Sequence, residues 1–402
     1  MKVLNLNTLS SIRSTGKIVD YLHEYLTRNG LESYVAYSFG PKIRNGFIIG
    51  NPFEKKIEAL TARITGLQGY TCFWGTLNFI EFLKKIKPDL IHIHNIHSNF
   101  LNYPMLFKYI IKNRTPVVIT LHDCWFYTGK CTHYFTQNCY KWQSTCKKCP
   151  QLRKDIPSWF LDRTEKMFND KKSWISSIEN LTVTGPSKWI IEEAKKSFLK
   201  NAKIIKTIYN PIDTNIFKPS DVTVLKNELN LNDKFIILGV ASKFNENNGL
   251  DKFIELSKII DKKNIIVLIG GIDYKNILPS NIIHIKETHN RGELSMYYSL
   301  ADLYVNFAKE NTFGLTTAEA LACGTPIVVY KTTANSEMLY DVNGFEMKVN
   351  QELNDIISIV ENIKKNEKEE NKQKRIDFVT KNFNKEKIMK EYIQIYNKIL
   401  KG

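Results

Sequence analysis

The 402-residue sequence has no apolar run close to the roughly 20 residues that a membrane-spanning helix requires. Apolar stretches such as Phe235–Val240 and Ile265–Ile269 have the length of buried strands. The first residues alternate as in a strand, and they lack the apolar segment and the small-residue cleavage site of a signal peptide. With 43% apolar and 24% charged residues, the composition is that of a globular protein, which we expect to stay in the cytoplasm.

The second half of the sequence has no excess charge of either sign. Residues 1–210 contain 31 Lys and Arg against 15 Asp and Glu, whereas the remaining residues contain 26 of each, so the first half carries the whole net charge of +16. A basic surface attracts nucleic acid, anionic lipid head groups or phosphorylated substrates. No Lys/Arg run resembles a nucleic-acid-binding tail, since Lys84–Lys87 falls on an amphipathic helix with a solvated face. We therefore expect no nucleic-acid partner.

Strand and helix patterns alternate along both halves of the sequence. In the first half, strands are predicted at Val3–Asn7, Leu90–His94 and Val117–Leu121, with helical patterns between them. The alternation breaks in a proline-bearing segment at 209–220 and restarts at Phe235–Val240. The pattern predicts an α/β fold of two Rossmann-like domains, each a mostly parallel sheet with helices on both faces.

Two glutamates, Glu310 and Glu319, bracket a segment with Gly314 at the predicted start of a helix. A glycine there lets the backbone come close to a ligand, and the N–H groups of the first helical turn attract phosphate. A carboxylate about one turn into the helix could accept two hydrogen bonds from a ribose diol, and the other glutamate could hold sugar hydroxyls. Taken alone, these residues leave open a plainer interpretation, a helix with a surface glutamate and a glycine-proline stop.

The segment Ala308–Tyr330 resembles the retaining family 4 glycosyltransferases, and more narrowly the bacterial enzymes of colanic-acid, capsule and O-antigen synthesis. The resemblance runs over nearly the whole chain. Its other motifs are Ser14–Lys17, Leu121–Trp125, Gly185–Trp189, Asn210–Asp213, Gly239–Ser242 and Tyr297–Asp302. It implies the GT-B architecture, in which two Rossmann-like domains face a central cleft and a C-terminal helix crosses back to the first domain.

The domain boundaries are placed on the basis of this resemblance. Residues 1–207 would form an N-terminal acceptor-binding domain with a Cys-rich insertion at 124–150, followed by a linker at 208–220. Residues 221–382 would form the C-terminal domain that binds the nucleotide sugar, and residues 383–402 a helix that packs back on the N-terminal domain.

The resemblance also implies how the donor is held. Glu310 would contact the hydroxyls of the donor sugar as a catalytic residue, and Glu319 would contact those of the ribose. His122, at the end of a strand, would orient the donor sugar as the second catalytic residue and would not act as a base. Gly16, in the loop after the first strand, would line the phosphates from the opposite side of the cleft. The remaining donor-binding loop is Thr312, Phe313, Gly314 and Leu315, with the N–H groups of the last three facing the sugar and pyrophosphate.

A retaining transfer of this kind needs no metal or cofactor for its chemistry. The leaving diphosphate of a UDP- or GDP-sugar donor is stabilised by positive charge, backbone N–H groups and helix N-termini. The acceptor that the resemblance implies is a lipid-linked oligosaccharide of bacterial surface polysaccharide synthesis. We expect His94 or His97 to contact the acceptor, because the histidines of Ile91–His97 alternate along a strand and favour a cleft-facing role over a metal site.

Two departures from the family pattern concern donor binding. Eight residues instead of the usual seven separate Glu310 from Glu319, so the loop must bulge or Asn311 must take part of the first role. The usual phosphate clamp of arginine and lysine reads Lys243 and Asn248, and the loss of a charge-assisted contact typically costs about 1.5–3 kcal/mol. Lys243 and Asn248 are nevertheless the expected donor contacts. The altered clamp leaves open a non-catalytic subunit that binds a nucleotide sugar or glycan, and an epimerase on the same architecture is a further alternative.

Five of the seven cysteines lie within residues 124–149. Four of them form the expected metal site: Cys131, Cys139, Cys146 and Cys149. In a reducing compartment such clustering favours a metal over a disulfide, and the final Cys-x-x-Cys has zinc-knuckle spacing. His133 could substitute for one thiolate. A structural zinc that braces the loop, free buried thiols and a disulfide all stay open as interpretations.

Aromatic and basic residues gather in the stretch Ile57–Ile86 and just before it. They include Phe73, Trp74, Phe79 and Phe82, with Lys55, Lys56, Arg63, Lys84 and Lys85. Such a segment can lie on an anionic membrane, although a core-facing helix of the acceptor domain explains it as well. Together with the asymmetric charge, it predicts peripheral association with the inner face of the plasma membrane, where a lipid-linked acceptor would be found.

Overall fold

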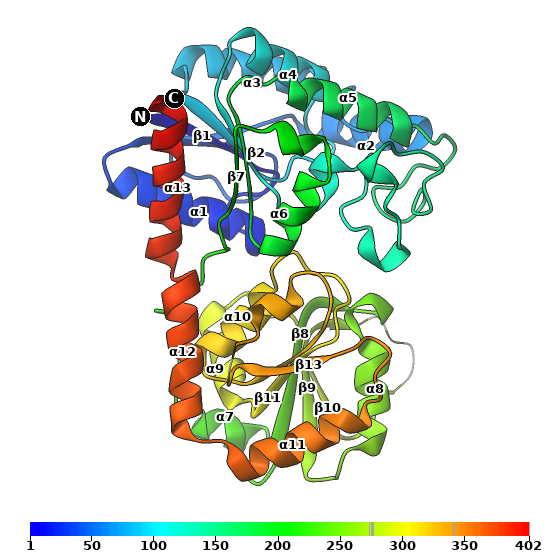
Figure 1. The fold of residues 1–402 in the computed structure, drawn as a ribbon, viewed down its shortest axis with the longest axis vertical. Helices are drawn as coiled ribbons and strands as arrows, with labels where there is room; N and C mark the ends of the chain where they lie inside the picture. The colour runs from blue at the N-terminus through cyan, green and yellow to red at the C-terminus, as the bar shows by residue number, and fades with distance from the viewer. Residues whose placement is uncertain (273, 275–276, 341, 402) are drawn as a thin grey trace. The chain divides into compact units, whose positions relative to one another are not determined.

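The computed structural model contains two compact units and describes residues 1–272, 274, 277–340 and 342–401. The first unit consists of Met1–Tyr209 and of the chain from Glu386 onwards, and the second consists of Asn210–Lys385 (Figure 1). Each unit is a parallel sheet flanked by helices, so the predicted fold class of two Rossmann-like α/β domains is confirmed.

The first unit is built on a seven-stranded parallel sheet. Its strands are β1 (Lys2–Leu6), β2 (Glu32–Tyr37), β3 (Gly46–Ile48), β4 (Leu90–Ile93), β5 (Val117–Thr120), β6 (Leu181–Gly185) and β7 (Ile204–Thr207). Their order in the sheet is β3-β2-β1-β4-β5-β6-β7. Its helices are α1 (Arg13–Arg28), α2 (Pro52–Thr65), α3 (Phe73–Ile86), α4 (Tyr103–Lys112), α5 (Thr164–Ser176), α6 (Lys188–Lys195) and α13 (Lys385–Lys401). The central strands are short apolar runs because both of their faces are buried.

Apolar side chains from alternate strand positions pack on both faces of this sheet. Leu4, Ile91 and Ile119 belong to one core, which also contains side chains of α3 and α4. Val3 and Val118 belong to a second core on the opposite face, with side chains of α1 and α13. The C-terminal helix therefore completes the first unit.

The face under α13 also holds buried polar side chains. Tyr396 Oη lies 2.7 Å from His92 Nδ1, and His92 Nε2 lies 2.7 Å from Thr120 Oγ1. Thr120 Oγ1 is also 2.7 Å from Thr184 Oγ1 and 3.3 Å from Tyr392 Oη. Hydrogen bonds as well as apolar contacts thus fix α13 to the strands that lead to the predicted histidine site.

The second unit is a six-stranded parallel sheet. Its strands are β8 (Phe235–Phe244), β9 (Asn264–Ile272), β10 (Ile282–Ile285), β11 (Leu303–Asn306), β12 (Ile327–Tyr330) and β13 (Gly344–Met347). Its helices are α7 (Thr223–Glu228), α8 (Leu250–Ile259), α9 (Arg291–Leu300), α10 (Leu315–Ala322), α11 (Asn354–Asn366) and α12 (Glu369–Phe383). The order β10-β9-β8-β11-β12-β13 reverses between β8 and β11, which is where open α/β sheets bind ligands. Within the described residues, no helix of either unit combines the length and apolar character needed to cross a bilayer.

The chain passes between the units at two places, and the two segments are paired inside the second unit. Ile212 forms an isolated parallel bridge with Asn384, and its N–H donates to the carbonyl of Phe383 at 2.7 Å. Lys385 Nζ lies 2.7 Å from a carboxylate oxygen of Asp213. The division at Tyr209 falls inside the segment 208–220, which the sequence suggested as a linker.

Candidate functional site

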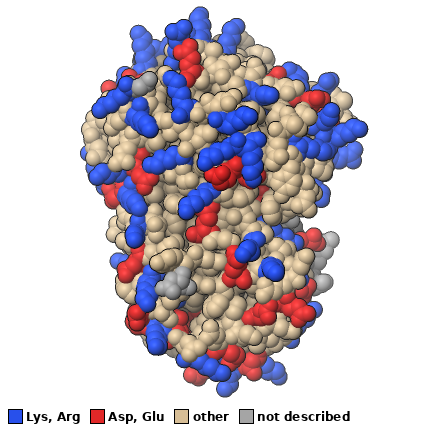
Figure 2. Space-filling model, viewed as in Figure 1, with Lys and Arg blue, Asp and Glu red and all other residues tan. Residues whose placement is uncertain are grey.

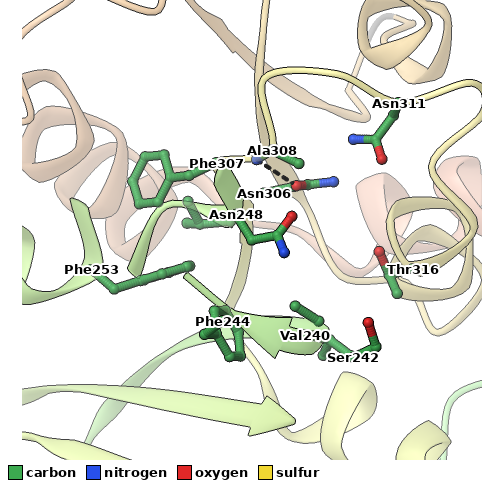
Figure 3. A pocket seen from close by; sticks show the side chains of 12 residues that line it. Val240, Ser242, Phe244, Asn248, Phe253, Asn306, Phe307, Ala308, Asn311 and Thr316 are labelled. Atoms are coloured by element: carbon green, nitrogen blue, oxygen red, sulfur yellow. Dashed lines mark hydrogen bonds between the residues drawn. The ribbon is translucent and has the colours of Figure 1, made fainter. Parts of the chain in front are cut away.

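A pocket in the second unit opens at the carboxyl ends of β8 and β11, at the reversal of strand order. Figure 3 shows the rings of Phe253 and Phe307 on its left side and the polar side chains of Asn311 and Thr316 on its right. The other lining residues are Val240, Ala241, Ser242, Phe244, Asn248, Val305, Asn306 and Ala308. None of these lining side chains is charged, so the pocket offers a ligand hydrogen bonds and apolar contact.

The predicted clamp residues occupy different places in this unit. Asn248 lines the pocket, and its Nδ2 donates to the carbonyl oxygen of Lys243 at 2.7 Å. Lys243 is exposed and lies just after an irregularity in β8 that follows Val240. The asparagine therefore holds the backbone beside the pocket, and the lysine side chain is not among the lining groups.

Gly314 stands immediately before α10, as the sequence predicts. Its φ of 91° is in the left-handed region that favours glycine, and this conformation turns the loop into the helix. Leu315, the first residue of α10, is half-buried, and Thr316 lines the pocket with its Oγ1 accepting from Tyr304 Oη at 2.8 Å. The N-terminal turn of α10 therefore lies beside the pocket, with N–H groups that favour anions.

Glu319 lies on α10, one turn after its start, and accepts a hydrogen bond from Tyr298 Oη at 3.1 Å. Burial raises the pKa of its carboxyl to about 7, and the nearby Arg291 and the Tyr298 hydrogen bond act in the opposite direction. Near neutral pH the group is thus divided between an acceptor-only carboxylate and a neutral acid, and only the carboxylate offers two proton-free oxygens, one for each hydroxyl of a diol.

The other residues of the predicted donor loop are neighbours in sequence of Asn311 and Thr316, but their side chains do not line the pocket. Glu310 and Thr312 are half-buried, and Phe313 is buried with its ring edge-on to Phe383 at a centroid distance of 5.2 Å. Asn311, the additional residue between the glutamates, lines the pocket, and its Nδ2 donates to Asn335 Oδ1 at 2.9 Å. Sequence reasoning missed Asn335, which lies well outside the Glu310–Glu319 motif.

In the first unit, the structure brings together two predicted histidines at the ends of neighbouring strands. His94 follows β4 and His122 follows β5, and His94 Nδ1 lies 2.9 Å from His122 Nε2. Burial lowers the pKa of His122 to about 4 and that of His94 well below its ordinary value, so both rings are neutral. Their contact therefore requires a single N–H, carried by one of the two facing nitrogens.

The surroundings of His94 indicate which ring donates. Its Nε2 is buried and has no hydrogen-bond partner among the described residues. Were His122 the donor, that Nε2 would carry a buried N–H without an acceptor, which is rarer in proteins than an unused acceptor. This favours His94 Nδ1–H as the donor and the Nδ1–H tautomer for His122.

His97 is paired with an aspartate that sequence reasoning left without a role. His97 Nε2 lies 2.7 Å from Asp123 Oδ2, and Asp123 Oδ1 accepts the N–H of Trp125 at 2.9 Å. Although burial opposes protonation, Asp123 raises the pKa of His97, and His97 in turn lowers the pKa of Asp123. The position of Asp123 directly after His122, at the end of a strand, could have indicated this pairing. Consecutive residues after a strand can contact different neighbours, as His122 and Asp123 do here.

Gly16 is not in the loop where the sequence placed it. It lies in the first turn of α1 and is buried. A Cβ there would be 3.2 Å from the backbone nitrogen of Ser11 and 3.4 Å from Leu9 Cβ. The glycine therefore allows the loop after β1 to pack closely against the start of α1.

The four cysteines do not form the expected zinc site in this structure. None of the seven cysteines, all of which lie in the described part of the chain, forms a disulfide. No group of three or more His, Cys, Asp or Glu among the described residues is arranged to hold a metal. Cys131 and Cys149 hydrogen-bond to each other, and Cys146 Sγ accepts the N–H of Gly129 at 3.1 Å. Other hydrogen bonds also hold the loop, for example the one that Lys130 Nζ donates to the carbonyl of Leu152 at 2.6 Å.

Comparison with solved structures agrees with the GT-B architecture. The chain aligns with a sucrose-phosphate synthase from Thermosynechococcus elongatus at 16% identity and a TM-score of 0.69, and the alignment covers 99% of each chain. It also aligns with Anabaena HepE in complex with UDP at 15% identity and a TM-score of 0.67, and this alignment covers 99% of the present chain and 100% of HepE. At these identities the likeness concerns the fold.

Family models cover both units. Residues 15–216 match the model described as Glycosyltransferase Family 4, and residues 221–390 match that of Glycosyl transferases group 1. The chain belongs to glycosyltransferase family 4.

Two named relatives are similar to this chain over different extents. It is 29% identical over 189 residues to the Escherichia coli K12 protein named "Putative colanic acid biosynthesis glycosyl transferase WcaC", and the match covers 43% of this chain and 45% of that protein. It is 24% identical to alpha-monoglucosyldiacylglycerol synthase of Acholeplasma laidlawii, covering 71% of this chain and 70% of the synthase. The chain thus aligns with less than half the length of the first relative.

Proposed function

We propose that this glycosyltransferase transfers a sugar, with retention of anomeric configuration, from a UDP- or GDP-sugar to a lipid-linked oligosaccharide in bacterial surface polysaccharide synthesis. The observation that carries the donor assignment is the pocket at the strand-order reversal, which Thr316 lines from the first turn of α10, the helix that also carries Glu319. The Anabaena structures with UDP and UDP-glucose support a nucleotide sugar as donor. The colanic acid relative and the lipid product in the name of the second relative support the acceptor class.

The proposed roles follow from the chemistry of these groups. The N–H groups at the start of α10 stabilise the leaving diphosphate while the bond between the anomeric carbon of the donor sugar and the diphosphate oxygen breaks. The acceptor hydroxyl forms its new bond on the same face and gives its proton to the leaving phosphate oxygen, so no side-chain base and no metal is assigned. Glu319 binds the ribose diol, Glu310 the sugar hydroxyls, and His122 orients the donor sugar.

In the first unit we assign His94 and His97 to the neighbourhood of the acceptor. Acceptors with a lipid anchor would place the protein at the inner face of the plasma membrane, which is where we propose that it works. The net charge of +16, carried by residues 1–210, supports attraction to anionic lipids.

A thermal-shift panel of nucleotides and nucleotide sugars tests the donor assignment. A ligand that binds only the folded protein raises its melting temperature by mass action, so we expect a shift with one class of nucleotide. Glu319→Gln should lose most of this shift and keep the unliganded melting temperature within a few degrees, whereas Glu352→Gln, at an exposed position of the same unit, should behave as wild type. An equal shift in Glu319→Gln would reject the ribose assignment.

A second candidate is a non-catalytic subunit that binds nucleotide sugar, because no charged side chain lines the pocket. It predicts a thermal shift with the donor but no release of nucleoside diphosphate in the presence of any acceptor. Turnover with a single donor and acceptor pair would exclude this candidate.

A further inference from the structure

Helix α2 (Pro52–Thr65) has its charged side buried and its apolar side exposed. Glu54, Lys55 and Glu58 have exposed fractions of 9%, 8% and 0%. The outward positions are apolar, with exposed fractions of 74% for Phe53, 45% for Ile57, 51% for Leu60 and 42% for Ile64. Steps of four, three and four residues place these four side chains on one stripe of a helix.

Hydrogen bonds to the buried carboxylates hold the helix in this orientation. Glu58 accepts the N–H groups of Gly69 at 2.5 Å and Thr71 at 2.8 Å. Glu54 accepts the N–H of Gly75 at 2.9 Å. Turning α2 so that its apolar stripe faced the core would break these bonds and leave backbone N–H groups unpaired. The exposed stripe is therefore a stable feature of the fold.

Exposed aromatic residues extend the stripe at both ends of α2. The N–H of Trp159 donates to the carbonyl of Arg63 at 2.6 Å, which fixes the segment 159–161 beside the C-terminal end of the helix. The bond from Gly75 to Glu54 fixes the start of α3 beside the other end. The α2 surface, as defined here, comprises Phe53, Ile57, Leu60, Ile64, Phe73, Trp74, Trp159, Phe160 and Leu161.

Cations accompany this surface, and the acidic groups of the helix are turned away from it. Lys56 is exposed on α2, and Arg63 lies in its last turn. The Cγ of Arg163 is 3.4 Å from the position of a Cβ at Gly66, directly after the helix. On the face drawn in Figure 2, Lys and Arg predominate over the first unit, whereas both signs are mixed over the second.

We infer that the α2 surface docks on an anionic lipid bilayer, with its aromatic and aliphatic side chains in the interfacial layer and the cations among the head groups. Exposed apolar patches of this kind mark interaction sites. A second copy of the chain is the less suitable occupant, because a two-fold contact through this surface would set Lys56, Arg63 and Arg163 against like charges. The inference deepens the proposed function, since it assigns a surface to the proposed membrane association.

The structure divides the basic aromatic segment of the sequence into two roles. Phe73 and Trp74 are 51% and 73% exposed and belong to the α2 surface. Phe79 is buried, and Phe82 stacks on Phe47 with ring centroids 4.6 Å apart, so both are part of the core of the first unit. The core-facing interpretation of the sequence thus holds for Phe79 and Phe82, and the membrane interpretation stays a prediction for Phe73 and Trp74.

Flotation with lipid vesicles tests the inference. Wild-type full-length protein should float with phosphatidylcholine vesicles that contain phosphatidylglycerol, and much less with phosphatidylcholine alone. The triple variant Phe53→Ser, Trp74→Ser, Phe160→Ser should partition roughly tenfold or more weaker, because these side chains would no longer leave water. The matched control Val224→Ser, Ile277→Ser, Tyr340→Ser removes exposed apolar side chains of the second unit and should float as wild type.

Two results would overturn the inference. One is equal flotation of the triple variant and the wild type. The other is no flotation of the wild type, together with a dimer in sedimentation that the triple variant dissociates, which would assign the α2 surface to a second copy. Thermal shifts with nucleotide sugars in lipid-free buffer separate the two proposals. If neither the wild type nor any variant shows a thermal shift, the donor assignment is contradicted. A shift that is retained in the triple variant shows that its pocket is intact.

Discussion

At the scale of single residues, His94 and His122 show how a neutral histidine can be held in one tautomer. The 2.9 Å contact between His94 Nδ1 and His122 Nε2 joins two rings whose pKa values burial lowers. A donor at His94 leaves the ring proton of His122 on Nδ1. We therefore predict that His94 acts on the proposed transfer through His122, as a positioning residue.

Substitutions at His94 test this role. His94→Leu removes the donor, and we expect kcat/KM to fall by roughly five- to tenfold, since one hydrogen bond contributes about 1–1.4 kcal/mol. His94→Asn keeps an N–H near the position of Nδ1 and should retain more activity. Nitrogen NMR shifts of the His122 ring should report the Nδ1–H tautomer in wild type and a mixture in His94→Leu. Equal activity in the leucine variant, or an unchanged tautomer, would contradict the assignment.

Glu319 makes a prediction about pH. Its pKa, raised by burial to about 7, means that the carboxylate we propose as the partner of the ribose diol forms as the pH rises through 7. Nucleotide affinity should therefore increase between pH 6 and pH 8, with a loss approaching tenfold per unit well below 7. Tyr298→Phe removes a hydrogen bond that lowers the pKa, so the midpoint should move to higher pH. Titration calorimetry across this range checks both, and Glu319→Gln should show no such midpoint.

At the scale of elements, α13 is attached to the sheet through buried polar contacts. Tyr396→Phe would leave His92 Nδ1 without its partner, and the penalty for an unsatisfied buried group is about 1–3 kcal/mol. We expect the free energy of unfolding to fall by that amount in urea denaturation. Tyr340→Phe, at a 67% exposed position, should change it by less than about 0.5 kcal/mol. Equal stability of the two variants would show that the Tyr396 bond contributes nothing.

Elements with a clear apolar period could be predicted from the sequence. Strands expected at Leu90–His94 and Val117–Leu121 agree with β4 and β5 to within one residue. The orientation of α2 could not be predicted, because the pattern shows that one side is charged but not that Glu58 meets unpaired N–H groups of Gly69 and Thr71.

Contacts between residues on neighbouring strands could not be predicted from the sequence either. The pairing of His94 with His122 depends on the register of β4 against β5, which places Ile93 opposite Ile119. The cysteine spacing allowed a metal site, but the loop conformation in which Cys146 accepts from Gly129 is not encoded in spacing. In the segment Glu310–Glu319, local helix rules predict that Gly314 precedes a helix and that Glu319 lies within it. The start of α10 was therefore predictable, and the conformation of the loop before it was not.

At the scale of the whole molecule, the features that support the proposal lie in different units. The first unit carries the basic residues that account for the net charge, His94, His97 and His122, and the α2 surface, and the second carries the pocket, α10 and Glu319. Such a division suits a transferase whose acceptor is anchored in a membrane and whose donor is a soluble nucleotide.

The central claim is tested most directly by following the anomeric proton of the product in NMR while the protein acts on the nucleotide sugar selected by thermal shift. With a lipid-linked saccharide acceptor, we predict release of one nucleoside diphosphate for each sugar transferred and a product with the anomeric configuration of the donor. Donor binding without diphosphate release for any acceptor, or a product of inverted configuration, would contradict the account.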